Sequence, residues 1–140
     1  MDAAEARDRF TAERVARLAT AGADGRPHVV PISFAVLGGA RIVSVVDHKP
    51  KRTPALRRLA NIEANPQVAV LADRWSENWS ELWWVRADGL ARVLAPGDAP
   101  KLRAQALRSL ASKYRQYAQR LPAGALVAID VQRWSGWSAA

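Results

Sequence analysis

The sequence contains no cysteine, no repeats and no long apolar run. Without cysteine, neither disulfides nor thiolate metal sites can form, and nothing indicates an oxidising compartment. No apolar run approaches the roughly 20 residues needed to cross a bilayer, and the charged segment from Met1 to Phe10 has no signal-peptide core. We therefore expect a soluble, cytoplasmic protein without a membrane partner.

Well-known sequence motifs of common enzyme classes are also missing. There is no nucleophile elbow, Walker loop or dinucleotide-binding glycine fingerprint. The two histidines, His28 and His48, have no neighbours at metal-ligand spacing, so we expect no metal site. Glu77 and Glu81 do not indicate a catalytic pair of carboxylates, because their sequence context is typical of solvated residues beside a turn. No catalytic side chain can be assigned, and an enzyme with this sequence would take its reactivity from a cofactor.

The 140 residues are 49% hydrophobic and carry a formal net charge of +8. This length and composition predict one globular domain over residues 1–140. The positive charge favours an anionic partner, either nucleic acid, a phosphorylated cofactor or an acidic metabolite. A basic face on the helix expected at 99–121 offers a surface for nucleic acid, but no nucleic-acid motif accompanies it, so this partner is the least favoured.

Turn signals and apolar periodicity predict six strands and about three helices. The Asp24-Gly25 turn joins the first two strands in a hairpin, and Gly89 predicts a bulge or a sharp bend within the fifth strand. Hairpins dominate, with one crossover, which favours a mostly antiparallel barrel with helices packed outside. The expected strands are 14–21, 27–36, 41–47, 67–73, 81–94 and 125–133, and the expected helices are 2–11, 53–65 and 99–121.

The segment between the third strand and the second helix is strongly basic. Lys49, Lys51 and Arg52 precede Thr53-Pro54, a pair that favours a helix start. The first turn of a helix has free backbone N–H groups and the positive end of the helix dipole. Three cations and a hydroxyl at that place predict a phosphate-binding site. The alternative is a solvated turn that happens to be basic.

Six tryptophans occur, at positions 75, 79, 83, 84, 134 and 137. Trp83 and Trp84 are adjacent on a strand, so their side chains point to opposite faces. One can fill the barrel while the other meets a partner or a ligand. For most of the six we expect a place in the core or in a dimer interface.

The chain resembles a known family in the order of its elements. The resemblance rests on RVARLATAGADGRPHVVPISFAV (14–36), RIVSVVDHKPKRTPALRRLANIEANPQVAVLAD (41–73) and WWVRADGLARVL (83–94). Together they are similar to the split-barrel flavin-binding proteins related to pyridoxamine 5′-phosphate oxidase. Within that group they most resemble the small actinobacterial F420-dependent (deazaflavin) oxidoreductases. The similarity spans nearly the whole chain.

The resemblance implies a mostly β fold with flanking helices, a six-stranded antiparallel split β-barrel of the FMN-binding type. It also implies a homodimer with two cofactor sites at the interface. The second strand would lie along the flavin ring, the third strand and its loop would continue the pocket, and the basic loop would hold the phosphate. Tryptophans would reach the site from the second subunit. The implied cofactor-binding residues are Val30, Pro31, Ile32, Ser33, Val45, Val46, Asp47, His48, Lys49, Lys51, Arg52, Thr53, Trp83 and Trp134.

The same resemblance implies an oxidoreductase that uses coenzyme F420 as a hydride carrier to reduce a small organic substrate. F420 is favoured over FMN because its acidic lactyl-oligoglutamate tail suits a chain of charge +8. One alternative is an FMN-dependent enzyme like pyridoxamine-phosphate oxidase, which is disfavoured because no second set of basic residues is evident for a substrate phosphate. Another is a flavin or deazaflavin carrier without turnover, and a nucleic-acid binder is the remote third.

Overall fold

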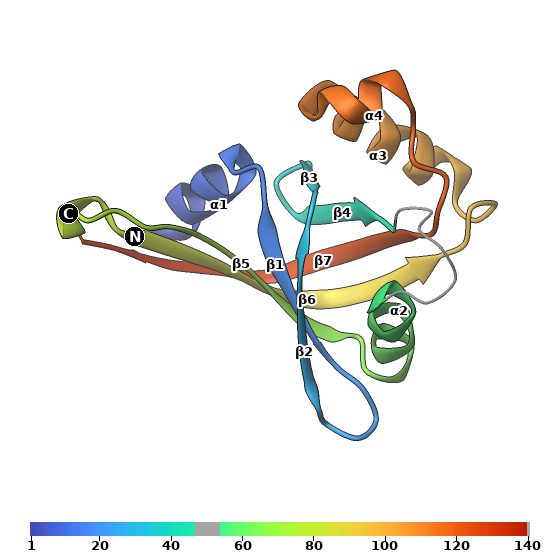
Figure 1. Cartoon of the computed structure of the whole chain (residues 1–140), viewed down its shortest axis with the longest axis horizontal. Helices are drawn as coiled ribbons and strands as arrows, with labels where there is room; N and C mark the ends of the chain where they lie inside the picture. Colours follow the sequence, from blue (N-terminus) through green and yellow to red (C-terminus); the bar gives the residue numbers. More distant parts are fainter. Residues whose placement is uncertain (47–53, 140) are drawn as a thin grey trace.

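The computed structural model of this chain describes residues 1–46 and 54–139 (Figure 1). Its strands form one sheet in the order β2-β1-β5-β6-β7-β4-β3, and every pairing is antiparallel. The expectation of a mostly antiparallel sheet with flanking helices is confirmed. The strands are β1 (Ala16–Ala21), β2 (Pro27–Ile32), β3 (Ala35–Leu37), β4 (Arg41–Val45), β5 (Gln67–Arg74), β6 (Trp83–Leu94) and β7 (Leu126–Ser138). The helices are α1 (Ala3–Ala12), α2 (Pro54–Ala64), α3 (Pro100–Lys113) and α4 (Arg115–Gln119), with a short 3₁₀ helix at Trp79–Glu81.

The described residues contain seven strands where six were expected, because the expected strand 27–36 is divided at Ser33-Phe34. Its first part, β2, pairs with β1, and its second part, β3, pairs with β4. These two short strands occupy the two edges of the sheet. One continuous piece of chain therefore forms both edges, and the sheet curls into a barrel. The two edge strands are not hydrogen-bonded to each other, and this gap is the split of a split barrel.

The break in the strand is held by side chains from distant parts of the sequence. The Tyr114 hydroxyl accepts a hydrogen bond from the Phe34 N–H (3.0 Å) and donates one to the Arg14 carbonyl (2.8 Å). The Ser44 hydroxyl donates to the Ser33 carbonyl at 2.8 Å. These bonds satisfy backbone groups that lose their ladder partners where the strand changes sheet edge.

The Tyr114 hydroxyl can reach the break because this residue lies outside the regular helix. The expected helix 99–121 is interrupted at this residue, whose backbone is extended (φ −118°, ψ 122°), so that α3 ends and α4 begins there. The Tyr114 N–H still donates to the Leu110 carbonyl at 2.9 Å and completes the last turn of α3. A helix continuing through this position would have kept the ring on the helix surface.

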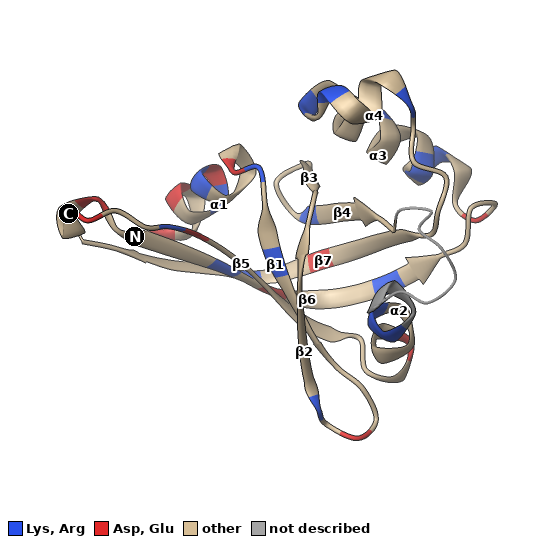
Figure 2. Ribbon diagram, viewed as in Figure 1, with Lys and Arg blue, Asp and Glu red and all other residues tan. Residues whose placement is uncertain are grey.

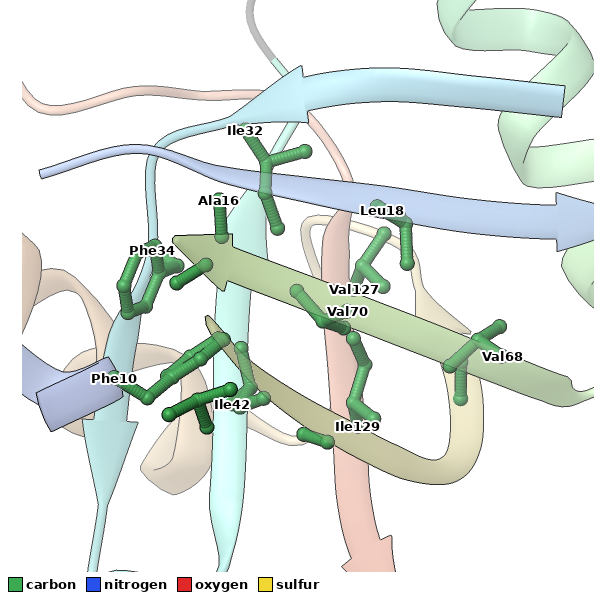
Figure 3. Packing of buried hydrophobic residues seen from close by; sticks show 14 of the residues in the cluster. Phe10, Ala16, Leu18, Ile32, Phe34, Ile42, Val68, Val70, Val127 and Ile129 are labelled. Atoms are coloured by element: carbon green, nitrogen blue, oxygen red, sulfur yellow. The ribbon is translucent and has the colours of Figure 1, made fainter. Parts of the chain in front are cut away.

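The core lies inside the curled sheet. In Figure 3, side chains from β1, β2, β5 and β7 converge with Phe10 of α1 and with Phe34. The ring centroids of Phe10 and Phe34 lie 4.7 Å apart. Ile62 of α2 joins the same cluster. A second cluster lies on the outer side of β3 and β4, where α3 covers the sheet through Ala106 and Leu110. This burial of apolar area supplies most of the drive to fold.

The expected irregularity at Gly89 is confirmed, although the unpaired residue is Gln132 on the neighbouring strand β7. The pairing of β6 with β7 shifts register between Asp88 and Gly89. A Cβ at position 89 would lie 2.4 Å from the Asp130 carbonyl oxygen, so only glycine allows the two strands to approach so closely. The first half of β6, the second half of β7 and the end of β5 extend together beyond the barrel. Both chain termini lie at that end of the molecule (Figure 1).

Replacing Tyr114 with Phe should destabilise the barrel at its split. The buried Phe34 N–H would lose its acceptor, a loss that costs about 1–3 kcal/mol of unfolding free energy. Chemical denaturation of both proteins measures the difference. Tyr117→Phe is the matched control, because its hydroxyl has no hydrogen bond to a described residue although its ring packs on Tyr114. Equal stability of Tyr114→Phe and the unmodified protein would contradict this account.

Candidate functional site

The predicted cofactor strand, β2, is an edge strand that pairs on one side only, with β1. Alternate backbone groups along its other edge are therefore available to a ligand. Pro31 is exposed and Val30 half-buried, whereas the side chain of Ile32 belongs to the core. A ligand along β2 would meet mainly backbone groups, as the resemblance implies. That contact stays a prediction.

The end of β4 is the second predicted part of the site. Val45 is buried in the cluster under α3, and the Val46 N–H donates to the Ala125 carbonyl at 2.9 Å. A Cβ on Gly124 would lie 1.8 Å from the Val46 carbonyl oxygen, so this close approach of two backbones requires glycine. The chain is thus held firmly where it leaves β4. The predicted residues that follow, Asp47, His48, Lys49, Lys51, Arg52 and Thr53, lie outside the described residues.

The two predicted tryptophans lie in the packing around α1. Trp83 is 9% exposed. The guanidinium carbon (Cζ) of Arg9 lies over the Trp83 ring, 5.6 Å from the ring centroid. Trp134 packs edge-on against Phe10 (5.1 Å between centroids) and donates its indole N–H to the Gly39 carbonyl at 3.2 Å. The position of Trp134 on β7 is eight residues from Leu126, the partner of Val45, or roughly 25 Å along the strand. Within one chain these rings are therefore structural. Their contact with a cofactor of a second subunit stays a prediction.

A groove of about 470 Å³ lies between the β1–β2 turn and α2. Figure 2 shows basic residues on α2 and charges of both signs at the turn. The groove was not predicted from the sequence. The spacing of its α2 residues, at positions 57, 60, 61 and 64, places them on one helix face and could have indicated it. Its lining residues are Gly22, Ala23, Asp24, Arg26, Arg57, Ala60, Asn61 and Ala64.

A smaller hollow of about 140 Å³ lies beside the split. It is lined by Ser33, which is one of the predicted site residues, and by Tyr114, Gln116 and Tyr117. The two tyrosine rings meet edge-on with centroids 5.6 Å apart. Neither tyrosine was predicted from the sequence as a site residue. The hollow offers hydroxyl and amide groups to a small polar ligand at the end of β2.

Lys113 is the most perturbed basic group near the split. Its ammonium lies 3.6 Å from the centroid of the Phe34 ring and donates to the Thr11 carbonyl at 3.3 Å. Burial, assisted by the nearby Arg14 guanidinium, lowers the pKa of this ammonium to about 8, against a smaller opposing effect of Glu13. On α2, burial likewise lowers the pKa of the Arg58 guanidinium.

Two kinds of feature are absent from the described part of the chain. No group of three or more His, Asp or Glu side chains in residues 1–46 and 54–139 could hold a metal ion. No helix within these ranges is long and apolar enough to cross a membrane.

Residues 3–138 match the family model described as pyridoxamine 5′-phosphate oxidase. A comparison with curated proteins finds no match. Among solved structures, a conserved hypothetical protein from Mycobacterium tuberculosis is 23% identical, with a TM-score of 0.78 and coverage of 99% of this chain and 86% of that one. An FAD-binding protein from Mesorhizobium loti is 24% identical (TM-score 0.72, coverage 97% and 94%). The heme-storage protein HutZ from Vibrio cholerae is 19% identical (TM-score 0.71, coverage 99% and 95%). At these identities the structural matches establish the fold.

Lys113 should make stability depend on pH above neutrality. Between pH 8 and the ordinary lysine value of 10.5, the unfolded chain binds a proton at this site that the folded chain has released. Unfolding free energy therefore rises with pH across this window. In Lys113→Met this rise should be smaller, as measured by urea denaturation at pH 7.5 and 10. The exposed Lys101→Met is the control and should keep the rise. A Lys113→Met protein with the same pH slope as the unmodified protein would refute the assignment.

Proposed function

This chain belongs to the pyridoxamine 5′-phosphate oxidase family, and we propose that it is an oxidoreductase that binds a flavin-type cofactor. The observation that carries the proposal is the family match over residues 3–138, supported by a sheet whose edge strand β2 has a free side. The similarity to an FAD-binding protein of the same fold agrees with a flavin-type ligand. We propose coenzyme F420 as the cofactor, with FMN as the alternative.

In this proposal the chain supplies binding and orientation. Backbone groups at the end of β2 and at Ser33, which follows it, lie along the ring, while Lys49, Lys51 and Arg52 hold the phosphate by charge-assisted hydrogen bonds. The cofactor ring supplies hydride-transfer chemistry when bound. A small organic substrate would then find polar groups in the hollow lined by Ser33 and Tyr117.

The net charge of +8 favours F420, which carries carboxylates beyond its phosphate, over FMN, which ends at it. A carrier without turnover is the second candidate, because the described residues contain no side chain with an evident catalytic role. The two functions differ in one respect that can be measured, namely whether a bound, reduced cofactor is reoxidised by an added organic acceptor.

A homodimer is the second part of the proposal. The sheet face that no described helix covers carries exposed apolar side chains on four strands. Trp84 and Trp137 are paired in register on β6 and β7, and Leu71 on β5 and Val29 on β2 (60% exposed) point to the same side. Exposed apolar groups spread over one sheet face are typical of an interface. A second copy on this face would lie beside β2 and could complete the cofactor site.

The cofactor proposal predicts saturable binding of F420, weaker binding of FMN, and dependence on the basic loop. Lys49→Ala or Arg52→Glu should weaken binding by about 1.5–3 kcal/mol, the scale of a lost charge-assisted hydrogen bond. Fluorescence titration of the purified protein measures all of these affinities. Arg120→Ala, an exposed residue after α4, is the matched charge control. Unchanged affinity in both loop variants would remove the loop from the site, and no binding of either cofactor would refute the proposed function.

The dimer proposal predicts that Trp84→Glu or Trp137→Glu shifts the protein from dimer to monomer. Each change places a charge in an apolar interface, where it must be desolvated on association. Light scattering coupled to gel filtration reports the mass. Leu121→Glu changes an exposed apolar residue away from this face and should remain dimeric. A monomeric unmodified protein at micromolar concentration would contradict the proposal.

A further inference from the structure

We propose that the groove between the β1–β2 turn and α2 binds a flexible, carboxylate-bearing chain that continues from the cofactor beyond its phosphate. Arg26 and Arg57 would be the residues that contact its carboxylates. The inference rests on the proposed function and specifies the part of the cofactor that this groove takes.

The groove has two walls of different origin. One wall is a single face of α2, because Arg57, Ala60, Asn61 and Ala64 follow the spacing i, i+3, i+4 and i+7. From Arg57 to Ala64 this wall is about 10 Å long, which matches about three extended residues of a peptide-like chain. The other wall is the β1–β2 turn, residues 22–26.

Both walls are fixed before any ligand arrives. The Gly25 N–H donates to the Gly22 carbonyl at 3.0 Å, and the Asp24 carboxylate accepts from the Arg26 N–H at 3.0 Å. On the helix side, the Asn61 amide donates to the hydroxyl of Thr20, which is 4% exposed, at 3.1 Å. A preformed groove avoids the ordering cost that a mobile surface would impose on binding.

The charges of the groove favour a carboxylate ligand. Arg57 is exposed and forms no ion pair with another described residue. Arg26 faces Asp24 at 3.7 Å, but both side chains are more than 60% exposed, and such a pair contributes little to stability. An incoming carboxylate can therefore bind both guanidinium groups, and the only interaction lost among the described residues is the weak Arg26–Asp24 pair. The planar, forked guanidinium group suits a carboxylate.

The shape favours a narrow chain over a nucleotide. Apart from the charged residues and Asn61, the lining consists of Gly22 and three alanines. The groove thus presents no aromatic or large apolar side chain on which a base could stack. FMN has no extension to place there. An adenosine extension would gain no stacking surface, whereas an oligoglutamate chain would meet two arginines.

The experiment compares F420 with its oligoglutamate tail and the same cofactor with the glutamates removed, each titrated by fluorescence into the full chain. The tailed form should bind on the order of tenfold more tightly at low salt, and the difference should shrink as salt is raised. The double variant Arg26→Ala/Arg57→Ala should lose most of this difference while its affinity for the tail-less form stays unchanged. Arg120→Ala/Arg115→Ala, which removes two exposed arginines of the α4 region, should keep the difference.

The possible failures are distinguishable. Equal affinity for the two forms, or equal weakening of both by the double variant, would overturn the groove proposal and leave the proposed function intact. FAD binding more tightly than FMN, with the gain lost in the double variant, would show that the groove takes a nucleotide and would overturn the acidic chain. If neither F420 nor FMN binds, the proposed function fails and the groove proposal fails with it. Thermal unfolding of each variant confirms that it is folded.

Discussion

The break at Ser33-Phe34 is the constraint on which the rest of this structure depends. A sheet can become a barrel only if its two edge strands meet, and here one piece of chain forms both edges. The backbone groups exposed by the break need partners, and the Tyr114 and Ser44 hydroxyls provide them. The interruption between α3 and α4 places Tyr114 at this break, α3 covers β3 and β4 beside it, and the hollow lined by Ser33 and Tyr114 lies at the same place.

The distribution of helices over the barrel leaves two kinds of surface open. α1 and α2 pack with the core cluster, and α3 covers one outer face, so that the other outer face presents tryptophan, leucine and valine. The edge strand β2 borders this bare face. A cofactor on β2 and a second subunit on the face would therefore be neighbours, which gives a physical reason for proposing a site that two subunits share.

Charge links the remaining features. The protein carries a large positive excess, which suits the anionic cofactor that we propose. The basic segment before α2, from Lys49 to Arg52, and Arg57 of the groove follow one another along the chain, and Arg26 lies on the opposite wall of the groove. An extended anion would be bound first at its phosphate and then along its tail.

The sequence by itself determined the type and order of most elements, the irregularity at Gly89, the helix start at Pro54 and the family. These depend on local signals, namely alternation, turn residues and capping, that act over a few positions. It did not reveal that strand 27–36 divides or that helix 99–121 is interrupted, because both depend on one hydroxyl meeting a backbone 80 residues away. Nor did it reveal the groove, whose two arginines lie 31 positions apart and become neighbours only when α2 packs beside the β1–β2 turn. Only the tertiary structure decided these contacts, because side chains far apart in sequence meet only after the sheet has curled and the helices have packed on it.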